Sequence, residues 1–276
     1  MWDNHVSRSM TSLSVNVNKI AWLRNARGGS RPDLCETTRT VIKAGANGIT
    51  VHPRPDQRHI RPQDVFDLQA IMSANSDIEF NIEGNPTSGP RENGYPGFDQ
   101  LVAVATPDQC TLVPDAEHQL TSDHGWDLSE ARTFDSVRSQ IANYQDLGAR
   151  VSLFIDPDPD QISRARDVGA DRVELYTGPY ADSVAVYGID STEAGERWEL
   201  YRRAVIHAKE RGLGINAGHD LNLTNLARFC SIGDIDEVSI GHALIADALD
   251  LGLAVTIERY LEALSKVVTN DQIMPT

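Results

Sequence analysis

The chain has 276 residues, 40% of them hydrophobic, and a formal net charge of −15 at pH 7. This length suits one large α/β barrel, and the acidic charge disfavours nucleic acid or an anionic membrane as a partner. The sequence has no apolar run near the roughly 20 residues that span a bilayer, no secretory signal pattern and only three cysteines, so we expect a cytoplasmic protein without a disulfide framework.

One segment departs from the acidic character of the chain. Residues 16–61 contain nine Lys or Arg and three Asp or Glu, a net charge of +6, which leaves −21 on the rest. A basic segment in an acidic protein is what a small anionic substrate requires. A basic surface patch without such a role is the alternative.

Short apolar segments rich in β-branched residues alternate with longer amphipathic segments along the chain. They predict eight strands, at residues 13–17, 48–52, 78–82, 109–113, 150–155, 172–175, 212–217 and 237–240. The patterns between them predict helices at residues 33–44, 62–74, 130–147, 160–168, 193–211, 223–230 and 243–268. Strands and helices in this order give parallel strands joined by right-handed crossovers.

The predicted fold is therefore a single-domain α/β protein, a (β/α)8 TIM barrel over residues 13–266, with a doubly wound open sheet as the alternative. We expect residues 1–12 and 267–276 to be flexible. Two connections, residues 84–97 and 177–192, are longer than a barrel needs, so we expect structureless loops there, the second serving as a lid. Four predicted helices end in a glycine, which tolerates the left-handed backbone that closes a helix: Gly45, Gly148, Gly169 and Gly212.

Titratable and polar side chains occur where the predicted strands run into their following loops, the end of the barrel where enzymes of this fold carry out their chemistry. In chain order they are Asn16, Asn18, Lys19, His52, Arg54, His59, Glu83, Glu174, His219, Asp220 and His242, the last of them preceded by Gly241. Several carboxylates and histidines at one mouth would be costly without a function. Because the pKa of both residue types can be tuned toward neutral pH, they suit repeated proton transfer.

Metal and nucleophile chemistry have weaker support in the sequence. Residues 15–18 read Val-Asn-Val-Asn, so the first strand lacks the His-x-His pair of metal-dependent barrel hydrolases. A zinc site formed by His52, Glu83 and His219 is the weaker alternative. The chain has neither a Gly-x-Ser-x-Gly elbow nor a glycine-rich nucleotide loop.

Two groups of residues suit anions. The turns at Gly218 and Gly241 follow the last two strands, where exposed backbone N–H groups commonly hold a phosphate in this fold. A second anion would suit Arg27, Arg54 and His59. Phosphorylated small molecules are therefore the expected partners.

These motifs resemble those of the pyridoxine 5′-phosphate synthase family. The similar segments are residues 15–28, 48–54, 58–60, 81–83, 112–114, 151–156, 177–178, 180–181, 216–219 and 240–243, in order over about 13–264. The resemblance implies a TIM-barrel transferase that condenses 3-amino-2-oxopropyl phosphate with 1-deoxy-D-xylulose 5-phosphate. The products would be pyridoxine 5′-phosphate, phosphate and water, in the ring-forming step of vitamin B6 synthesis. The family is cytoplasmic and octameric and uses no metal or organic cofactor.

The resemblance also implies residue roles. His52 and Glu83 would accept protons and His219 would donate one. Contacts to the aminoketone phosphate would come from Asn16, Arg27, Gly241 and His242, and contacts to the deoxyxylulose phosphate from Arg54, His59 and Thr121. Glu174 matches a strand-six glutamate of the family.

The chain departs from the family pattern at two places. Asn18 and Lys19 stand where the family often has Asp-His, at a position that touches the deoxyxylulose substrate. Lysine offers hydrogen bonds and charge but not imidazole acid–base behaviour. Asp220 replaces a glycine whose backbone N–H contacts phosphate, a contact that Asp220 can still make if its carboxylate turns away.

Two other functions stay open. Lys19 alone of the four lysines lies at the mouth end of a predicted strand, so an aldolase-type barrel with a Schiff base would have to use it. A non-catalytic barrel that only binds a phosphorylated metabolite is the other alternative. Binding alone does not require three proton-transfer groups, which argues against it.

Overall fold

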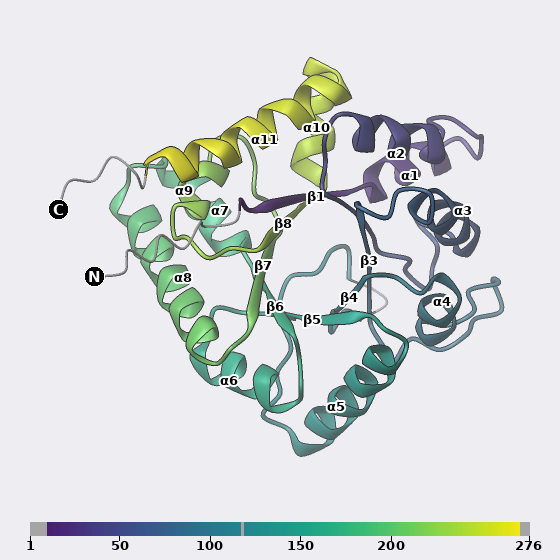
Figure 1. The fold of residues 1–276 in the computed structure, drawn as a ribbon, viewed down its shortest axis with the longest axis horizontal. Helices are drawn as coiled ribbons and strands as arrows, with labels where there is room; N and C mark the ends of the chain where they lie inside the picture. The colour runs from purple at the N-terminus through teal and green to yellow at the C-terminus, as the bar shows by residue number, and fades with distance from the viewer. Residues whose placement is uncertain (1–9, 117–118, 271–276) are drawn as a thin grey trace, which may run out of the picture.

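Eight parallel strands close into a barrel, each hydrogen-bonded to the next in chain order and the last to the first (Figure 1). The computed structural model describes residues 10–116 and 119–270. The strands are β1 (Ser12–Asn16), β2 (Gly48–Val51), β3 (Glu79–Gly84), β4 (Gln109–Leu112), β5 (Arg150–Ile155), β6 (Arg172–Tyr176), β7 (Gly214–Gly218) and β8 (Glu237–Ile240). The predicted TIM barrel is confirmed, and closure between β1 and β8 shows that the open-sheet alternative is wrong.

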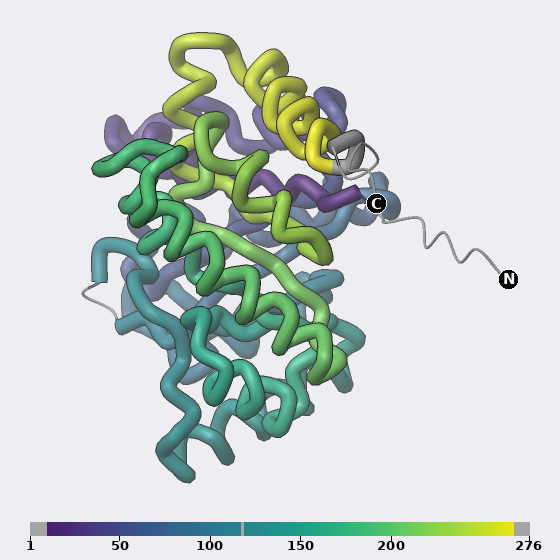
Figure 2. The backbone as a smooth tube through the Cα atoms, turned by 90° about the vertical axis from the view of Figure 1, so that its left-hand side faces the viewer, coloured from purple at the N-terminus to yellow at the C-terminus, as the bar shows by residue number. Residues whose placement is uncertain are grey.

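Helices surround the barrel (Figure 1). They are α1 (Asn18–Asn25), α2 (Leu34–Lys43), α3 (Pro62–Met72), α4 (Phe98–Ala105), α5 (Ala131–Asp146), α6 (Pro159–Asp167), α7 (Gly178–Tyr187), α8 (Thr192–Glu210), α9 (Leu226–Cys230), α10 (His242–Leu251) and α11 (Leu253–Asn270). Helices α6 and α7 both pack against α8, and Figure 2 faces the side of the barrel that they cover. Among the described helices, none combines the length and apolar character needed to cross a membrane.

The connection at residues 177–192 contains helix α7, so the predicted structureless loop is wrong, whereas its role as a lid stays a prediction. Pro179 lies in the first turn of α7, where a backbone N–H has no partner within the helix, so the lack of an N–H in proline costs nothing there. The Gly-Pro pair therefore begins the helix. Tyr180 is fully buried, and its hydroxyl donates to the carbonyl of Asn225 at 3.2 Å. The predicted helix at 243–268 is two helices, since Gly252 has a φ of 80° between α10 and α11.

The four glycines expected to close helices all have positive φ, from 73° at Gly212 to 99° at Gly45. They return the chain sharply from helix to strand. The segments predicted to be flexible lie largely outside the described residues. Of their described parts, Ser12 begins β1 and residues 267–270 belong to α11.

The interior of the barrel is polar below its mouth. Asn216 Nδ2 donates to Gln109 Oε1 at 3.2 Å and lies 3.4 Å from Glu237 Oε1. Burial raises the pKa of Glu237 well above its usual range, which favours the uncharged form of this carboxyl group. The hydrogen-bonded layer supports the strand ends that carry the site.

Candidate active site

A cavity of about 350 Å³ opens where the barrel strands run into their following loops. The side chains that line it come from segments far apart in the chain. Among them are thirteen of the fourteen residues singled out from the sequence: Asn16, Asn18, Lys19, His52, Arg54, His59, Glu83, Thr121, Glu174, His219, Asp220, Gly241 and His242.

The fourteenth residue, Arg27, is exposed in the turn after α1 and does not line the cavity. The sequence patterns did not single out several other lining residues: Trp22, Val113, Leu120, Ser122, Phe154 and Ser239. Trp22, Val113 and Phe154 lie within the family-like segments, and Ser239 lies in the last strand. Leu120 and Ser122 follow β4 in an irregular segment, where no periodic pattern reports a side chain's direction.

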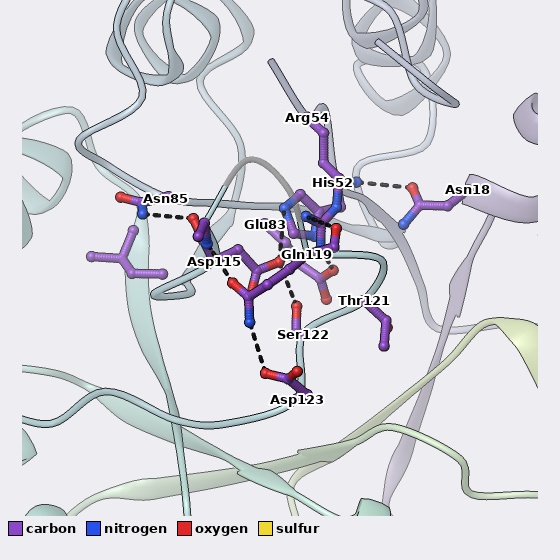
Figure 3. Close-up of polar contacts among 12 residues, drawn as sticks. Asn18, His52, Arg54, Glu83, Asn85, Asp115, Gln119, Thr121, Ser122 and Asp123 are labelled. Carbon is purple, nitrogen blue, oxygen red and sulfur yellow. Dashed lines mark hydrogen bonds and ion pairs between the residues drawn. The ribbon is translucent and has the colours of Figure 1, made fainter. Parts of the chain in front are cut away.

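Glu83 and His52 form a buried acid–base pair (Figure 3). His52 Nδ1 lies 3.7 Å from Glu83 Oε2, to which Asn16 Nδ2 donates at 3.3 Å. Burial, with the carboxyl group of Glu174 nearby, raises the pKa of Glu83 well above its ordinary value. Burial and the Arg54 charge lower the pKa of His52 well below its own. His52 is therefore neutral at pH 7 with a lone pair available, and ionised Glu83 is a stronger base than an exposed carboxylate.

Asp115 holds Arg54 at the cavity wall (Figure 3). The Arg54 guanidinium is ion-paired with Asp115 Oδ2, which also accepts from Ser122 Oγ at 2.8 Å. His52 Nε2 lies 3.9 Å from the same oxygen. The sequence did not point to Asp115, because it lies 61 residues from Arg54 in an irregular segment after β4.

His59 faces the cavity as a neutral hydrogen-bond donor. Burial and the nearby charge of Arg54 lower the pKa of His59 to about 3. Its Nδ1 accepts from the backbone N–H of Ile60 at 2.9 Å, so the ring proton lies on Nε2. The His59 carbonyl accepts from Asn25 Nδ2 at 2.8 Å, which fixes the segment against α1.

The start of α1 brings two polar side chains into the mouth. Asn18 Oδ1 accepts from the backbone N–H of His52 at 2.9 Å (Figure 3). Lys19 Nζ lies 4.4 Å from the centroid of the Trp22 ring, a cation–π contact. Burial and neighbouring arginines lower the pKa of Lys19.

Glu174 lies beneath the turn after β7. Burial raises the pKa of Glu174 to about 7. A Cβ added to Gly218 would overlap Glu174 Oε1, so only glycine leaves room for this carboxyl group. Its other oxygen has no hydrogen-bond partner among the described residues. In the turn itself, His219 Nε2 lies 2.9 Å from Thr121 Oγ1.

The turn after β8 presents a helix N-terminus to the cavity. Gly241 is the N-cap of α10, and no side chain caps its first turn. The first N–H groups of α10 are therefore available to an anion, with the helix dipole favouring negative charge. A Cβ on Gly241 would lie 3.1 Å from Asn16 Cβ, which is tighter than ordinary packing.

Among residues 10–116 and 119–270, no three His, Cys, Asp or Glu side chains are arranged as a metal site. The alternative zinc site of His52, Glu83 and His219 thus has no geometric support. The cavity is lined instead by proton-transfer groups, basic side chains and the N-terminus of α10.

Comparison with known proteins identifies close relatives. A family model described as pyridoxal phosphate biosynthesis protein PdxJ matches residues 13–266. Pyridoxine 5′-phosphate synthase of Xanthomonas oryzae pv. oryzae (strain PXO99A) is 52% identical over 255 residues, 92% of this chain and 96% of the relative. The enzyme of the same name from Porphyromonas gingivalis is 51% identical over 257 residues, 93% of this chain and 100% of the relative.

Solved structures resemble the chain more distantly. 3-Keto-L-gulonate-6-phosphate decarboxylase from Vibrio cholerae superimposes with a TM-score of 0.59 at 10% identity, over 97% of this chain and 100% of that chain. At this identity the likeness shows the barrel fold alone. The family match and the sequence relatives, which extend over the whole barrel, show that this chain belongs to the PdxJ family of pyridoxal phosphate biosynthesis proteins.

Proposed function

We propose that this chain is a pyridoxine 5′-phosphate synthase of vitamin B6 biosynthesis, which condenses 3-amino-2-oxopropyl phosphate with 1-deoxy-D-xylulose 5-phosphate. Its family and the names of its relatives support the biosynthetic role. One observation carries the proposal furthest. The lining of one cavity includes a buried acid–base pair, Glu83 and His52, together with two groups of residues that suit phosphates, and this combination supports the proposal.

The two phosphates would occupy different parts of the rim. The loops after β7 and β8 offer the N-terminus of α10 and His242 to the aminoketone phosphate. The loop after β2 offers Arg54 and the Nε2–H of His59 to the deoxyxylulose phosphate. Arg27 lies outside the cavity lining, so its proposed contact would require a movement of the turn after α1.

Ring formation requires protons to be removed from carbon and nitrogen and returned to leaving oxygens. Neutral His52 and ionised Glu83 are the proposed acceptors, lying side by side with their reactive atoms 3.7 Å apart. His219, whose Nε2 lies 2.9 Å from Thr121 Oγ1, is the proposed donor. Holding all three residues at one cavity would position them for successive proton transfers.

A Schiff-base aldolase is the second candidate, because burial lowers the pKa of Lys19 as a nucleophilic amine requires. The two candidates differ in one covalent bond. Borohydride reduction of the protein with deoxyxylulose phosphate alone leaves the protein mass unchanged under the synthase proposal. An adduct mapped to Lys19 would favour the aldolase.

The family resemblance further supports two proposals: that identical chains form an octamer, and that the reaction needs no metal or organic cofactor.

Expression in a bacterium that lacks its own synthase tests the function as a whole. We expect the chain to restore growth without added pyridoxine and Glu83→Gln to fail at equal expression. Absence of growth with well-folded chain in the cell would count against the function.

A further inference from the structure

The turn after β7 has a strained backbone. His219 and Asp220 have φ values of 89° and 60°, in the left-handed region that residues with a side chain rarely adopt. The single hydroxyl proton of Thr177 is shared between the carbonyls of Gly218 and His219, which lie 2.7 and 2.5 Å from Oγ1. Asn225 Nδ2 donates to the carbonyl of Asp220 at 3.2 Å. These bonds hold the turn in a conformation that costs on the order of 1 kcal/mol per residue.

Both ring nitrogens of His219 have a partner. Nδ1 lies 3.1 Å from Asp220 Oδ2, and Nε2 lies 2.9 Å from Thr121 Oγ1. The ring also packs against Tyr176, with centroids 5.3 Å apart. The hydrogen bond to His219 lowers the pKa of Asp220, so its carboxylate is ionised at neutral pH and can only accept. The proton shared between them therefore lies on Nδ1.

We propose that Asp220 is a positioning residue for His219. Its carboxylate fixes the tautomer protonated on Nδ1 and stabilises the imidazolium, so that Nε2 is the atom that exchanges a proton with substrate. This inference rests on the proposed function, in which His219 is the proton donor. It assigns the Asp220 side chain a task separate from any contact of its backbone with phosphate.

Other charged and titratable groups face this pair. Glu174 and Tyr176 approach from β6 and His52 from the end of β2, while Lys19 of α1 and His242 of α10 act on the Asp220 carboxylate. Asp220 is the carboxylate hydrogen-bonded to the His219 ring. Its side chain is 47% exposed, so solvent screens part of its effect. We therefore expect a moderate influence on His219, not an all-or-none one.

Two substitutions separate charge from hydrogen bonding. Asp220→Asn keeps an acceptor for Nδ1–H and tolerates the positive φ, but removes the charge. Asp220→Gly removes the acceptor as well and relieves the strained backbone. Asp234 provides matched controls, because it is exposed, has a φ of 56° and does not line the cavity. Asp234→Asn and Asp234→Gly should change stability only.

The first test uses the ligand-free protein and needs no activity. With ¹⁵N-labelled histidine, and the His219 signals assigned by their loss in His219→Gln, neutral His219 should show protonated Nδ1 and unprotonated Nε2. Asp220→Gly should shift the ring toward protonated Nε2, whereas Asp220→Asn, which keeps an acceptor, should leave Nδ1 protonated. An unchanged tautomer in Asp220→Gly would overturn the proposal.

The second test uses turnover. Because Asp220→Gly removes the acceptor for Nδ1–H, it should lower kcat roughly 3–10-fold, whereas Asp220→Asn, which keeps an acceptor, should lower kcat less. The Asp234 variants should leave kcat unchanged. Equal losses of kcat in the two Asp220 variants would indicate a purely structural role and would contradict the proposal. If neither the wild type nor any variant makes product, the proposed function is wrong. The NMR result then still decides whether Asp220 positions the His219 ring.

Discussion

The two proposed proton acceptors have environments that push their pKa values in opposite directions. His52 is 6% exposed and lies close to Arg54, so the charged form of its ring is disfavoured. Glu83 is 9% exposed among other carboxyl groups, so its charged form is disfavoured too. Both groups therefore favour the uncharged state. Hydrogen bonds donated by polar substrate atoms would favour the ionised, proton-accepting form of Glu83 during turnover.

Glu83→Gln and His52→Asn should each lower kcat on the order of 10²–10⁴-fold, because each removes a proton acceptor while keeping a polar side chain of similar shape. Steady-state kinetics with both substrates measures the loss, and circular dichroism verifies the fold. Glu196→Gln, on the exposed face of α8, is the control and should leave kcat unchanged. Near-normal turnover in either site variant would remove that residue from the proposed chemistry.

Glu174 should make the folded state less stable as the pH rises. Its pKa is about 7 in the fold and near 4.5 when exposed, so the folded state holds this proton more tightly. The resulting stability is fully present below pH 4.5 and is lost as the pH rises through about 7. Glu174→Gln stays neutral, so at pH 8 it should be more stable than wild type by roughly 1–3 kcal/mol.

Urea denaturation of wild type and Glu174→Gln at pH 5 and pH 8 measures this difference. We expect the stabilisation at pH 8 to be much smaller at pH 5, where the wild-type carboxyl group is already protonated. An equal effect at both pH values would indicate a packing change. A destabilised variant at pH 8 would contradict the assigned direction of the pKa shift.

At the scale of elements, the strands were predictable and three helices were not. Strands such as β5 consist mainly of buried apolar residues, so they can be recognised in the sequence without knowledge of the neighbouring strands. Helix α4 has only eight residues, and α7 begins with Gly-Pro, which also suits a loop. Helix α1 turns polar residues toward the cavity, so its pattern reflects the site as much as the core.

The candidate site was predictable to the extent that its residues follow strands. Residues at the ends of β2, β3, β7 and β8, or soon after them, line the cavity because parallel strands all end at one mouth. Asp115 was missed, since a loop of irregular backbone gives no periodic signal for side-chain direction. The pairing of Asp220 with His219 was missed for a different reason. It depends on two positive φ values that no residue-type pattern indicates.

Helix α1 is fixed to α3 by a buried ion pair, which supports the position of Lys19 at the mouth. Arg24 Nη1 and Nη2 donate to the two oxygens of Asp64 at 2.5 and 2.8 Å, with both side chains 10% exposed. Asp64→Asn would leave the guanidinium without its charge partner, so the free energy of unfolding should fall by about 3 kcal/mol. We also expect KM for the deoxyxylulose phosphate to rise more than kcat falls.

The control is Glu36→Gln, which breaks the exposed pair between Glu36 and Arg39 on α2. Exposed pairs contribute about 0–1 kcal/mol, so the free energy of unfolding should hardly change. Urea denaturation at pH 7 compares the two variants. A loss below 1 kcal/mol in Asp64→Asn would show that α1 is held by apolar packing instead.

At the scale of the whole molecule, only some of the basic residues in the segment 16–61 belong to the site. Of the nine Lys and Arg residues, Lys19 and Arg54 line the cavity. Arg24 is buried in its ion pair with Asp64, and Arg58 Nη1 donates to the carbonyl of Gln119 at 3.0 Å. The remaining five are exposed away from the cavity lining: Arg27, Arg31, Arg39, Lys43 and Arg61. Charge in a stretch of sequence thus indicates an anionic substrate without locating its contacts.

Arg54 should act on one substrate in particular. Arg54→Ala removes a charge-assisted contact proposed for the deoxyxylulose phosphate, so KM for that substrate should rise more than KM for the aminoketone phosphate. Initial rates with each substrate varied in turn measure both constants. Arg39→Ala, an exposed residue on α2, is the control. Equal increases for the two substrates would point to a general structural role for Arg54.

The most direct measurement follows both products of the purified protein in chelator-treated buffer, with each substrate supplied alone and then together. We predict equimolar pyridoxine 5′-phosphate and inorganic phosphate, formed only when both substrates are present and at a rate that added zinc does not raise. Phosphate released from either substrate alone, or no pyridoxine 5′-phosphate from the two together, would contradict the proposed condensation.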